Sequence, residues 1–167
     1  TDYGQYLDSL EMTATIRGFE PLYIQRIAQL TNKSNQFNLT TLRCSEDDIR
    51  AMAADADALC LCGKLVDKFG DNGIVTVVAG KRRGDLLDLT LWLMSCRVLK
   101  RGMEDAMMDT LMAQAAAAGV KTVVGHYYPT AKNAMVRDFY AQFGFAKTAE
   151  DAEGNTEWRL EVSGYEP

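Results

Sequence analysis

The sequence contains a single histidine, His126, and only three prolines and four cysteines among 167 residues. One histidine and scattered thiols provide few ligands for zinc, so we predict no metal site. Basic residues are also the minority, 18 against 23 acidic ones, and the net charge of −5 excludes a broadly basic nucleic-acid surface. No apolar run has the length of a membrane-spanning helix, so we expect neither nucleic acid nor a membrane as a partner.

The four cysteines do not have the spacing of a secreted disulfide framework. Cys60 and Cys62 lie within an apolar run. We therefore predict buried free thiols and a cytoplasmic protein. No signal peptide is visible, and the chain begins with Thr1, which is consistent with a fragment or a processed product.

With 47% hydrophobic and 25% charged residues, the chain has the composition of one folded domain. Residues 1–11 are polar with scattered aromatics, and we predict that they form a leader or linker. A single domain is expected over residues 12–167, because no internal repeat or low-complexity segment interrupts it.

The most informative stretch lies between residues 86 and 119. Its apolar pattern predicts a strand over residues 86–99, a tight corner at residues 100–102 and a helix over residues 103–118. The apolar phase of the strand shifts near residues 93–95, which indicates a β-bulge that would free backbone groups for an extended ligand. Burial of both faces of a central strand explains the shift equally well.

The remaining elements give the fold class. Further strands are predicted over residues 12–17, 58–69, 74–79, 121–128, 145–148 and 157–162, and further helices over residues 21–30, 45–54 and 130–143. Ser45 and Asp48 have the spacing of a capping box, and a hairpin turn is expected at residues 70–73. Hairpins followed by crossovers indicate an α/β (α+β) fold, with a mixed, mostly antiparallel central sheet and helices on both faces.

This element order and two segments resemble the GNAT acyltransferase fold. Residues 133–145 carry an Asn, then Phe-Tyr, then Gly-Phe, as one helix of that family does. The family's phosphate motif corresponds to residues 99–104, where Gly102 matches, and Leu99 and Glu104 stand at the other two motif positions. The resemblance implies that a pantetheine arm lies where the fourth and fifth strands diverge.

The resemblance also implies roles for single residues. Asn133 would contact the pantetheine or acyl group and Tyr140 would protonate the leaving thiolate; from the pattern alone, Asn133 is equally a helix cap and Tyr140 a core aromatic. His126 is a candidate base or a structural residue, and Asp88 is a weaker candidate. The residues expected to bind the cofactor are Met94, Ser95, Cys96, Arg97, Val98, Lys100, Arg101, Gly102 and Lys132.

A narrower resemblance covers nearly the whole chain. Four strings are similar to FkbH-like proteins: YIQRIAQLTNKSNQFNLTT (residues 23–41), DKFGDNGIV (67–75), WLMSCRVL (92–99) and PTAKN (129–133). Those proteins join a HAD-like phosphatase domain to a GNAT-like domain, and transfer a glyceryl unit from bisphosphoglycerate to an acyl carrier protein, towards methoxymalonyl-type polyketide extender units. This chain matches only the C-terminal part, so Cys96 is not assigned the role of the family's thioester-forming Cys.

The FkbH-like resemblance favours a ligand-facing loop over residues 31–41, whose composition alone suits a solvated loop. Its substrate-contacting residues would be Asn32, Lys33, Asn35, Gln36, Asn38 and Thr40. The implied reaction is acyl transfer with the phosphopantetheine of an acyl carrier protein, or CoA, as cofactor. The implied partners are the carrier protein and, in a full-length relative, a HAD-like domain. The alternatives are a non-catalytic module that docks a carrier protein and a stand-alone N-acetyltransferase.

Overall fold

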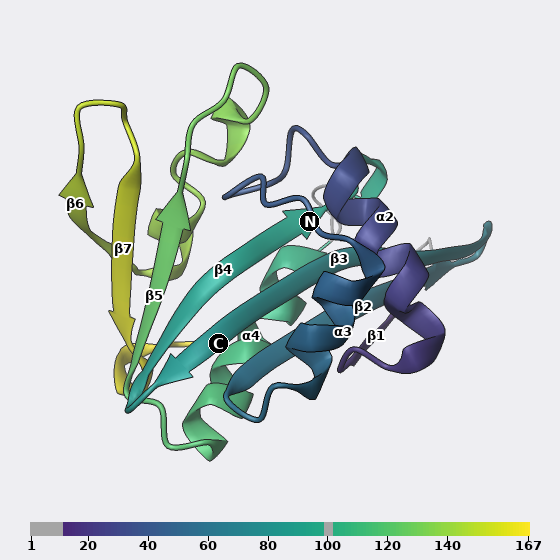
Figure 1. Ribbon diagram of the computed structural model, residues 1–167, viewed down its shortest axis with the longest axis horizontal. Helices are drawn as coiled ribbons and strands as arrows, with labels where there is room; N and C mark the ends of the chain where they lie inside the picture. The colour runs from purple at the N-terminus through teal and green to yellow at the C-terminus, as the bar shows by residue number, and fades with distance from the viewer. Residues whose placement is uncertain (1–11, 99–101) are drawn as a thin grey trace.

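A mixed sheet of seven strands forms the centre of the computed structural model, which describes residues 12–98 and 102–167 (Figure 1). The strand order is β1-β2-β3-β4-β5-β7-β6, and all neighbours are antiparallel except β4 and β5. The strands are β1 Thr13–Arg17, β2 Ala58–Asp67, β3 Gly70–Arg83, β4 Leu86–Met94, β5 Thr122–Tyr127, β6 Ala146–Glu150 and β7 Thr156–Glu161. The predicted mixed, mostly antiparallel sheet is confirmed, while the leader or linker predicted for residues 1–11 lies outside the described residues.

Helices cover both faces of the sheet, as predicted (Figure 1). One face carries α2 (Ile24–Lys33), which follows a short 3-10 turn η1 (Pro21–Tyr23), and α3 (Glu46–Ala54), whose predicted capping box is present. The other face carries α4 (Met103–Ala117), whose buried side chains pack against the sheet. Gly102 has φ 84° directly before α4, while residues 100 and 101 of the predicted corner lie outside the described residues. No helix within the described ranges is long and apolar enough to span a membrane.

The hairpin turn between β2 and β3 lies earlier than predicted. Residues 68–69 form the turn, and the Asp67 carboxylate accepts a hydrogen bond from the Phe69 N–H at 2.8 Å. Residues 70–73, predicted as the turn, instead begin β3, where Gly70 pairs with Asp67. The local Asp67 side-chain bond closes the chain reversal before the glycines are reached.

The β-bulge exists, but it lies in the middle of β4 rather than near residues 93–95. Leu91 pairs with Ala79 and Leu89 with Gly80, which leaves Thr90 as the extra residue. Leu89 accordingly packs on the α4 side and Leu91 on the α2 and α3 side. Because leucines stand on both sides of the bulge, the alternation of the sequence shows no break there. The open alternative is therefore also correct, since both faces of β4 are buried.

The strand predicted to reach residue 99 ends at Met94. The Ser95 N–H donates to the Val75 carbonyl, and the chain then turns into the 3-10 segment η2 (Cys96–Val98). The helix predicted up to Phe143 is likewise replaced by two 3-10 turns, η3 (Ala134–Val136) and η4 (Tyr140–Phe143). Bonds from residue i+3 to residue i close these turns, and Gly144, with φ 89°, ends the second as expected. A final 3-10 turn, η5 (Val162–Gly164), follows β7.

β4 and β5 form a split in the sheet. They pair only over three residues, from Leu86 with Thr122 to Asp88 with Val124. Beyond these pairs the two strands diverge, while β5 remains paired with β7 over its whole length (Figure 1). The predicted gap in the middle of the sheet is therefore present, and its contents decide what the domain can bind.

Candidate functional site

Residues 37–40 fill the wide part of the split. The Leu39 N–H donates to the Trp92 carbonyl at 3.0 Å, and the Met94 N–H donates to the Phe37 carbonyl at 3.0 Å. On the other side, the Tyr128 N–H donates to the Leu39 carbonyl at 2.9 Å. This short segment, called the strap below, thus pairs with β4 and with the residue that directly follows β5. A ligand amide cannot pair with the Met94 N–H while the strap is in place.

Asn133 braces the strap. Its side chain is fully buried, and its Nδ2 donates to the Asn38 carbonyl at 2.9 Å and to the Tyr128 carbonyl at 3.0 Å. Its Oδ1 accepts from the Thr130 N–H at 2.8 Å and from the Tyr127 hydroxyl at 3.3 Å. Both donors and both lone-pair directions of the amide are used. Asn133 makes no side-chain bond to the following turn, so the predicted helix cap is not formed.

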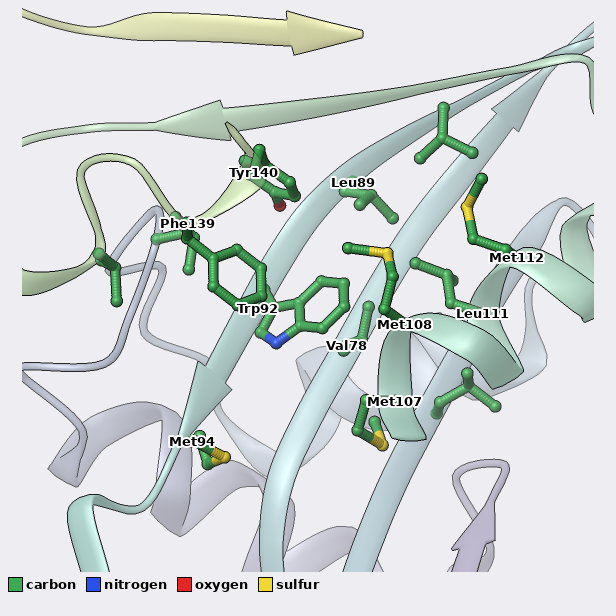
Figure 2. Close-up of a cluster of buried hydrophobic side chains, with 14 of the residues drawn as sticks. Val78, Leu89, Trp92, Met94, Met107, Met108, Leu111, Met112, Phe139 and Tyr140 are labelled. Atoms are coloured by element: carbon green, nitrogen blue, oxygen red, sulfur yellow. The ribbon is translucent and has the colours of Figure 1, made fainter. Parts of the chain in front are cut away.

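Tyr140 closes the narrow part of the split from the α4 side (Figure 2). Its ring is 1% exposed and contacts the rings of Trp92, Phe139 and Phe145. It lies so close to β5 that a Cβ built on Gly125 would be 2.4 Å from a ring carbon. Burial, and then the charge of Asp88, raise the pKa of Tyr140 far above its usual value. Tyr140 therefore occupies the core position that its apolar pattern allowed, away from the pocket described next.

His126 and Asp88 pair where the two strands begin to diverge. The His126 Nε2 lies 2.5 Å from the Asp88 Oδ1, and the His126 ring centroid is 5.9 Å from that of Tyr128. The carboxylate fixes the orientation of the imidazole, as expected for a base or for a structural pair. Neither residue lines the pocket.

A pocket of about 790 Å³ lies beside the end of β4. It is built from α2, the loop that follows it, the β4 end with η2, and Lys132. It brings together the predicted loop residues Lys33, Asn35 and Gln36 with several of the predicted cofactor-binding residues. The lining residues are Arg26, Leu30, Lys33, Ser34, Asn35, Gln36, Met94, Ser95, Cys96, Arg97 and Lys132.

Other predicted site residues do not reach this pocket. Val98 is buried and Gly102 is exposed, and neither lines it; Lys100 and Arg101 lie outside the described residues. Asn32, Asn38 and Thr40 bind backbone carbonyls of the protein rather than facing the pocket. These three amide and hydroxyl side chains shape the loop, so a loop rich in polar residues is only partly ligand-facing.

The loop wall of the pocket is held by internal hydrogen bonds. Arg43 donates from Nη1 to the Ser34 carbonyl at 2.7 Å and from Nη2 to the Asn35 Oδ1 at 2.6 Å. The Cys96 Sγ lies 3.2 Å from the Gln36 Oε1, which links the loop to the β4 end. The wall is therefore organised before any ligand arrives.

The pocket is electropositive in an acidic protein. Arg26, Lys33, Arg97 and Lys132 line it, and no carboxylate from residues 12–98 or 102–167 does. Burial, and then the nearby charge of Arg97, lower the pKa of Arg26. Sequence reasoning missed Arg26, because one arginine on an amphipathic helix has the pattern of a solvent-exposed residue. The only sign of a functional role was its place in the FkbH-like string at residues 23–41.

The thiols are free, as predicted, but not all are buried. Cys44 and Cys62 are buried and Cys60 is partly buried, whereas Cys96 is exposed in the pocket. The correction follows from the early end of β4, which places Cys96 in a surface turn. Within residues 12–98 and 102–167, no group of three His, Cys, Asp or Glu side chains is placed to hold a metal ion.

No protein-family model and no curated protein matches the sequence. Solved structures do match the fold. Ard1 from Thermoplasma volcanium aligns with a TM-score of 0.68 at 18% identity, over 89% of this chain and 97% of that one. The ribosomal-protein-S18-alanine N-acetyltransferase from Escherichia coli gives 0.67 at 14% identity, over 90% and 94%. The PaiA N-acetyltransferase from Thermoplasma acidophilum, solved with coenzyme A, gives 0.66 at 13%, over 89% and 99%. The chain therefore has the GNAT fold, as predicted.

Proposed function

We propose that this domain transfers an acyl group from a thioester to a pantetheine thiol or a hydroxyl, and that the reaction takes place in the pocket beside the end of β4. We further propose that it acts with an acyl carrier protein in forming glyceryl or methoxymalonyl extender units. The GNAT fold supports acyl transfer in general. The FkbH-like strings support the carrier protein and the extender units.

One observation carries the proposal: three of the four FkbH-like strings meet in this pocket. Residues 23–41, 92–99 and 129–133 each contribute lining residues. The fourth string lies beside it, since the Arg97 Nη2 is 3.5 Å from the Asn72 carbonyl. These segments are far apart in the chain but converge on one cavity. A shared ligand would account for their common similarity to FkbH-like proteins.

The proposed chemistry uses groups present in the pocket. The acceptor attacks the thioester carbonyl, a C–S or C–O bond forms, the donor C–S bond breaks, and the acceptor proton ends on the departing thiolate. The Met94 and Ser95 N–H groups already donate to Phe37 and Val75 carbonyls. Side-chain donors, the amides of Asn35 and Gln36, would therefore hold the carbonyl oxygen, a role commonly worth about 3 kcal/mol.

The reactive end of a pantetheine arm fits the pocket better than the split. The strap and Tyr140 fill the split, whereas the pocket has a volume typical of small-molecule sites and a wall of amides and hydroxyls. The Ser95 hydroxyl would hold the arm through one of its amides. The pantetheine thiol supplies the thioester chemistry when the arm is bound.

One observation favours a second candidate, a non-catalytic module that docks the carrier protein. The strap occupies the backbone groups of β4 that a bound arm was expected to use. A stand-alone N-acetyltransferase is a third candidate, because proteins of that activity are among the similar folds.

Single-turnover transfer tests the proposal. The purified chain is mixed with an acyl-CoA or an acylated carrier protein, and the acyl group on a second holo carrier protein is followed by intact-protein mass spectrometry. We expect transfer to holo but not apo carrier protein, reduced at least about tenfold by Arg97→Gln and unchanged by Arg83→Gln, which lies outside the pocket.

The rival functions predict different results. Binding of holo carrier protein without acyl movement from any donor would support the docking module. Acetylation of an amine by acetyl-CoA, with no carrier protein present, would support the N-acetyltransferase. Tyr140→Phe tests the predicted acid: unchanged single-turnover transfer removes Tyr140 from the mechanism.

A further inference from the structure

The basic residues of the pocket differ from most others in the protein. Elsewhere, Arg50, Lys64 and Lys81 each pair with a carboxylate. Within the described part of the chain, Arg26, Lys33, Arg97 and Lys132 form no ion pair, although acidic residues outnumber basic ones overall. The pocket thus concentrates positive charge that no carboxylate in the described part of the chain compensates by an ion pair.

Two of these side chains are near one another. The charge of Arg97 acts on Arg26, whose guanidinium donates to the Gln29 amide oxygen at 2.9 Å and to no carboxylate among the described residues. Like charges placed together in a concave, partly desolvated site repel each other unless an anion lies between them. Arginine pairs suit carboxylate and phosphate groups because each guanidinium can donate two parallel hydrogen bonds.

The position of these charges indicates which part of a ligand they meet. They surround the cavity that holds Cys96, Ser95 and Gln36, the end at which we place the reacting thioester. A pantetheine arm separates its phosphate from its thiol by its whole length. An anion in this cavity is therefore part of the acyl group or of its acceptor, and not the phosphate of the arm.

We infer that the pocket recognises a small anionic substrate, whose carboxylate or phosphate ester is bound by Arg26 and Arg97 with Lys33 and Lys132 at the rim. This inference rests on the proposed function for the identity of the reacting end. The anion site itself needs only the geometry of the pocket.

Cys96 provides an internal reporter, because it is the exposed thiol of the pocket. The whole chain is alkylated with iodoacetate, which is anionic, or with iodoacetamide, which is neutral and similar in size, and the rates at Cys96 are read by peptide mass spectrometry. The ratio of the two rates is divided by the same ratio for N-acetylcysteine. We expect a normalised ratio of at least about 10 at low ionic strength, falling as salt is added.

Charge variants test the assignment. Arg26→Gln and Arg97→Gln should each lower the normalised ratio several-fold, while Arg83→Gln, a matched loss of one charge outside the pocket, should leave it unchanged. Glycerol 3-phosphate or malonate should protect Cys96 from iodoacetamide, and glycerol should not. Stronger protection by the phosphate ester or by the dicarboxylate identifies which anion is the ligand class.

The outcomes separate this inference from the proposed function. A normalised ratio near 1 in the wild-type chain, or equal loss in Arg83→Gln, overturns the anion site even if acyl transfer is observed. A high ratio lost in Arg26→Gln, without acyl transfer from any donor, upholds the anion site and removes the transferase proposal. Protection by inorganic phosphate but by neither organic anion would reduce the site to non-specific anion binding and overturn the substrate assignment.

Discussion

The narrow and wide parts of the β4–β5 split are filled in different ways. At the narrow part, Tyr140 packs as a buried aromatic ring against Gly125 and the neighbouring rings. At the wide part, the strap is held by backbone hydrogen bonds and by the buried amide of Asn133. Beyond the strap lies the pocket, whose lining is mostly polar and cationic. Along the two diverging strands, the buried Tyr140 ring is therefore followed by the strap and then by the pocket.

This contrast separates the residues that determine folding stability from the residues that we expect to bind a ligand. The contents of the split are buried, so substitutions there should cost folding free energy. The cations beside it are exposed or half-buried and form no ion pair with a described residue, so their loss should cost little stability and should affect ligands instead.

The largest effect is expected at Tyr140. Tyr140→Ala removes a fully buried ring and leaves a cavity between β5 and Trp92, so we expect a loss of about 4 kcal/mol in the free energy of unfolding. Tyr140→Phe keeps the ring and should cost less than about 1 kcal/mol. Urea denaturation of the two variants measures the difference.

A double-mutant cycle isolates the contact with β5. Gly125→Ala alone should destabilise by about 3 kcal/mol, because its methyl group would overlap the Tyr140 ring. In a Tyr140→Ala background the added methyl has space, so the two effects should not add. Additive costs would mean that the ring does not lie against Gly125.

The next effect is expected at Asn133. Asn133→Ala leaves the Asn38 and Tyr128 carbonyls and the Thr130 N–H without their partner, for a cost of about 3 kcal/mol. Asn133→Asp keeps the acceptor but loses both donated bonds, and should be nearly as damaging. Hydrogen exchange at the Leu39 and Tyr128 amides should accelerate in both variants. Unchanged exchange there would show that Asn133 does not hold the strap.

The thiols of the core and the thiol of the pocket also differ, in their expected reactivity. Burial raises the pKa of Cys60 and of Cys62 from 9.0 to about 11, so below pH 9 each should carry about 100-fold less reactive thiolate than an ordinary thiol. Cys96 should therefore be alkylated first, as peptide mass spectrometry would show. Stability contributed by the two neutral thiols is complete below pH 9 and is lost as the pH rises through about 11. Equal alkylation of all three sites in folded protein would contradict their placement.

The parts of the fold that the sequence could predict are those marked by side chains in local patterns. The Ser45–Asp48 capping box, the apolar stripe of α4 and the glycine before it are all present. The sequence predicts the bulge later in the strand than Thr90, because leucines occupy both faces of β4 and hide the change of phase.

The site was harder to predict than the fold. The strap pairs through backbone groups. A backbone hydrogen bond such as the one between Leu39 and Trp92 does not depend on side-chain identity, so the sequence gives no sign of it. Its neighbours Asn38 and Asn133 are polar residues with full internal partners, which a sequence pattern cannot distinguish from ligand contacts. Arg26 becomes a pocket residue only when α2 is packed beside the end of β4.

The smallest effect on stability is expected from the pocket cations, and it should have the opposite sign to the others. Arg26→Gln removes the repulsion from Arg97 and breaks no ion pair among the described residues, so it should raise the free energy of unfolding by no more than about 0.5 kcal/mol. The increase should shrink in high salt, because screening already weakens the repulsion in the wild-type protein. Thermal denaturation at two salt concentrations, with Arg83→Gln as the matched charge loss, measures it. A clear loss of stability in Arg26→Gln would mean that this side chain supports the fold rather than a ligand.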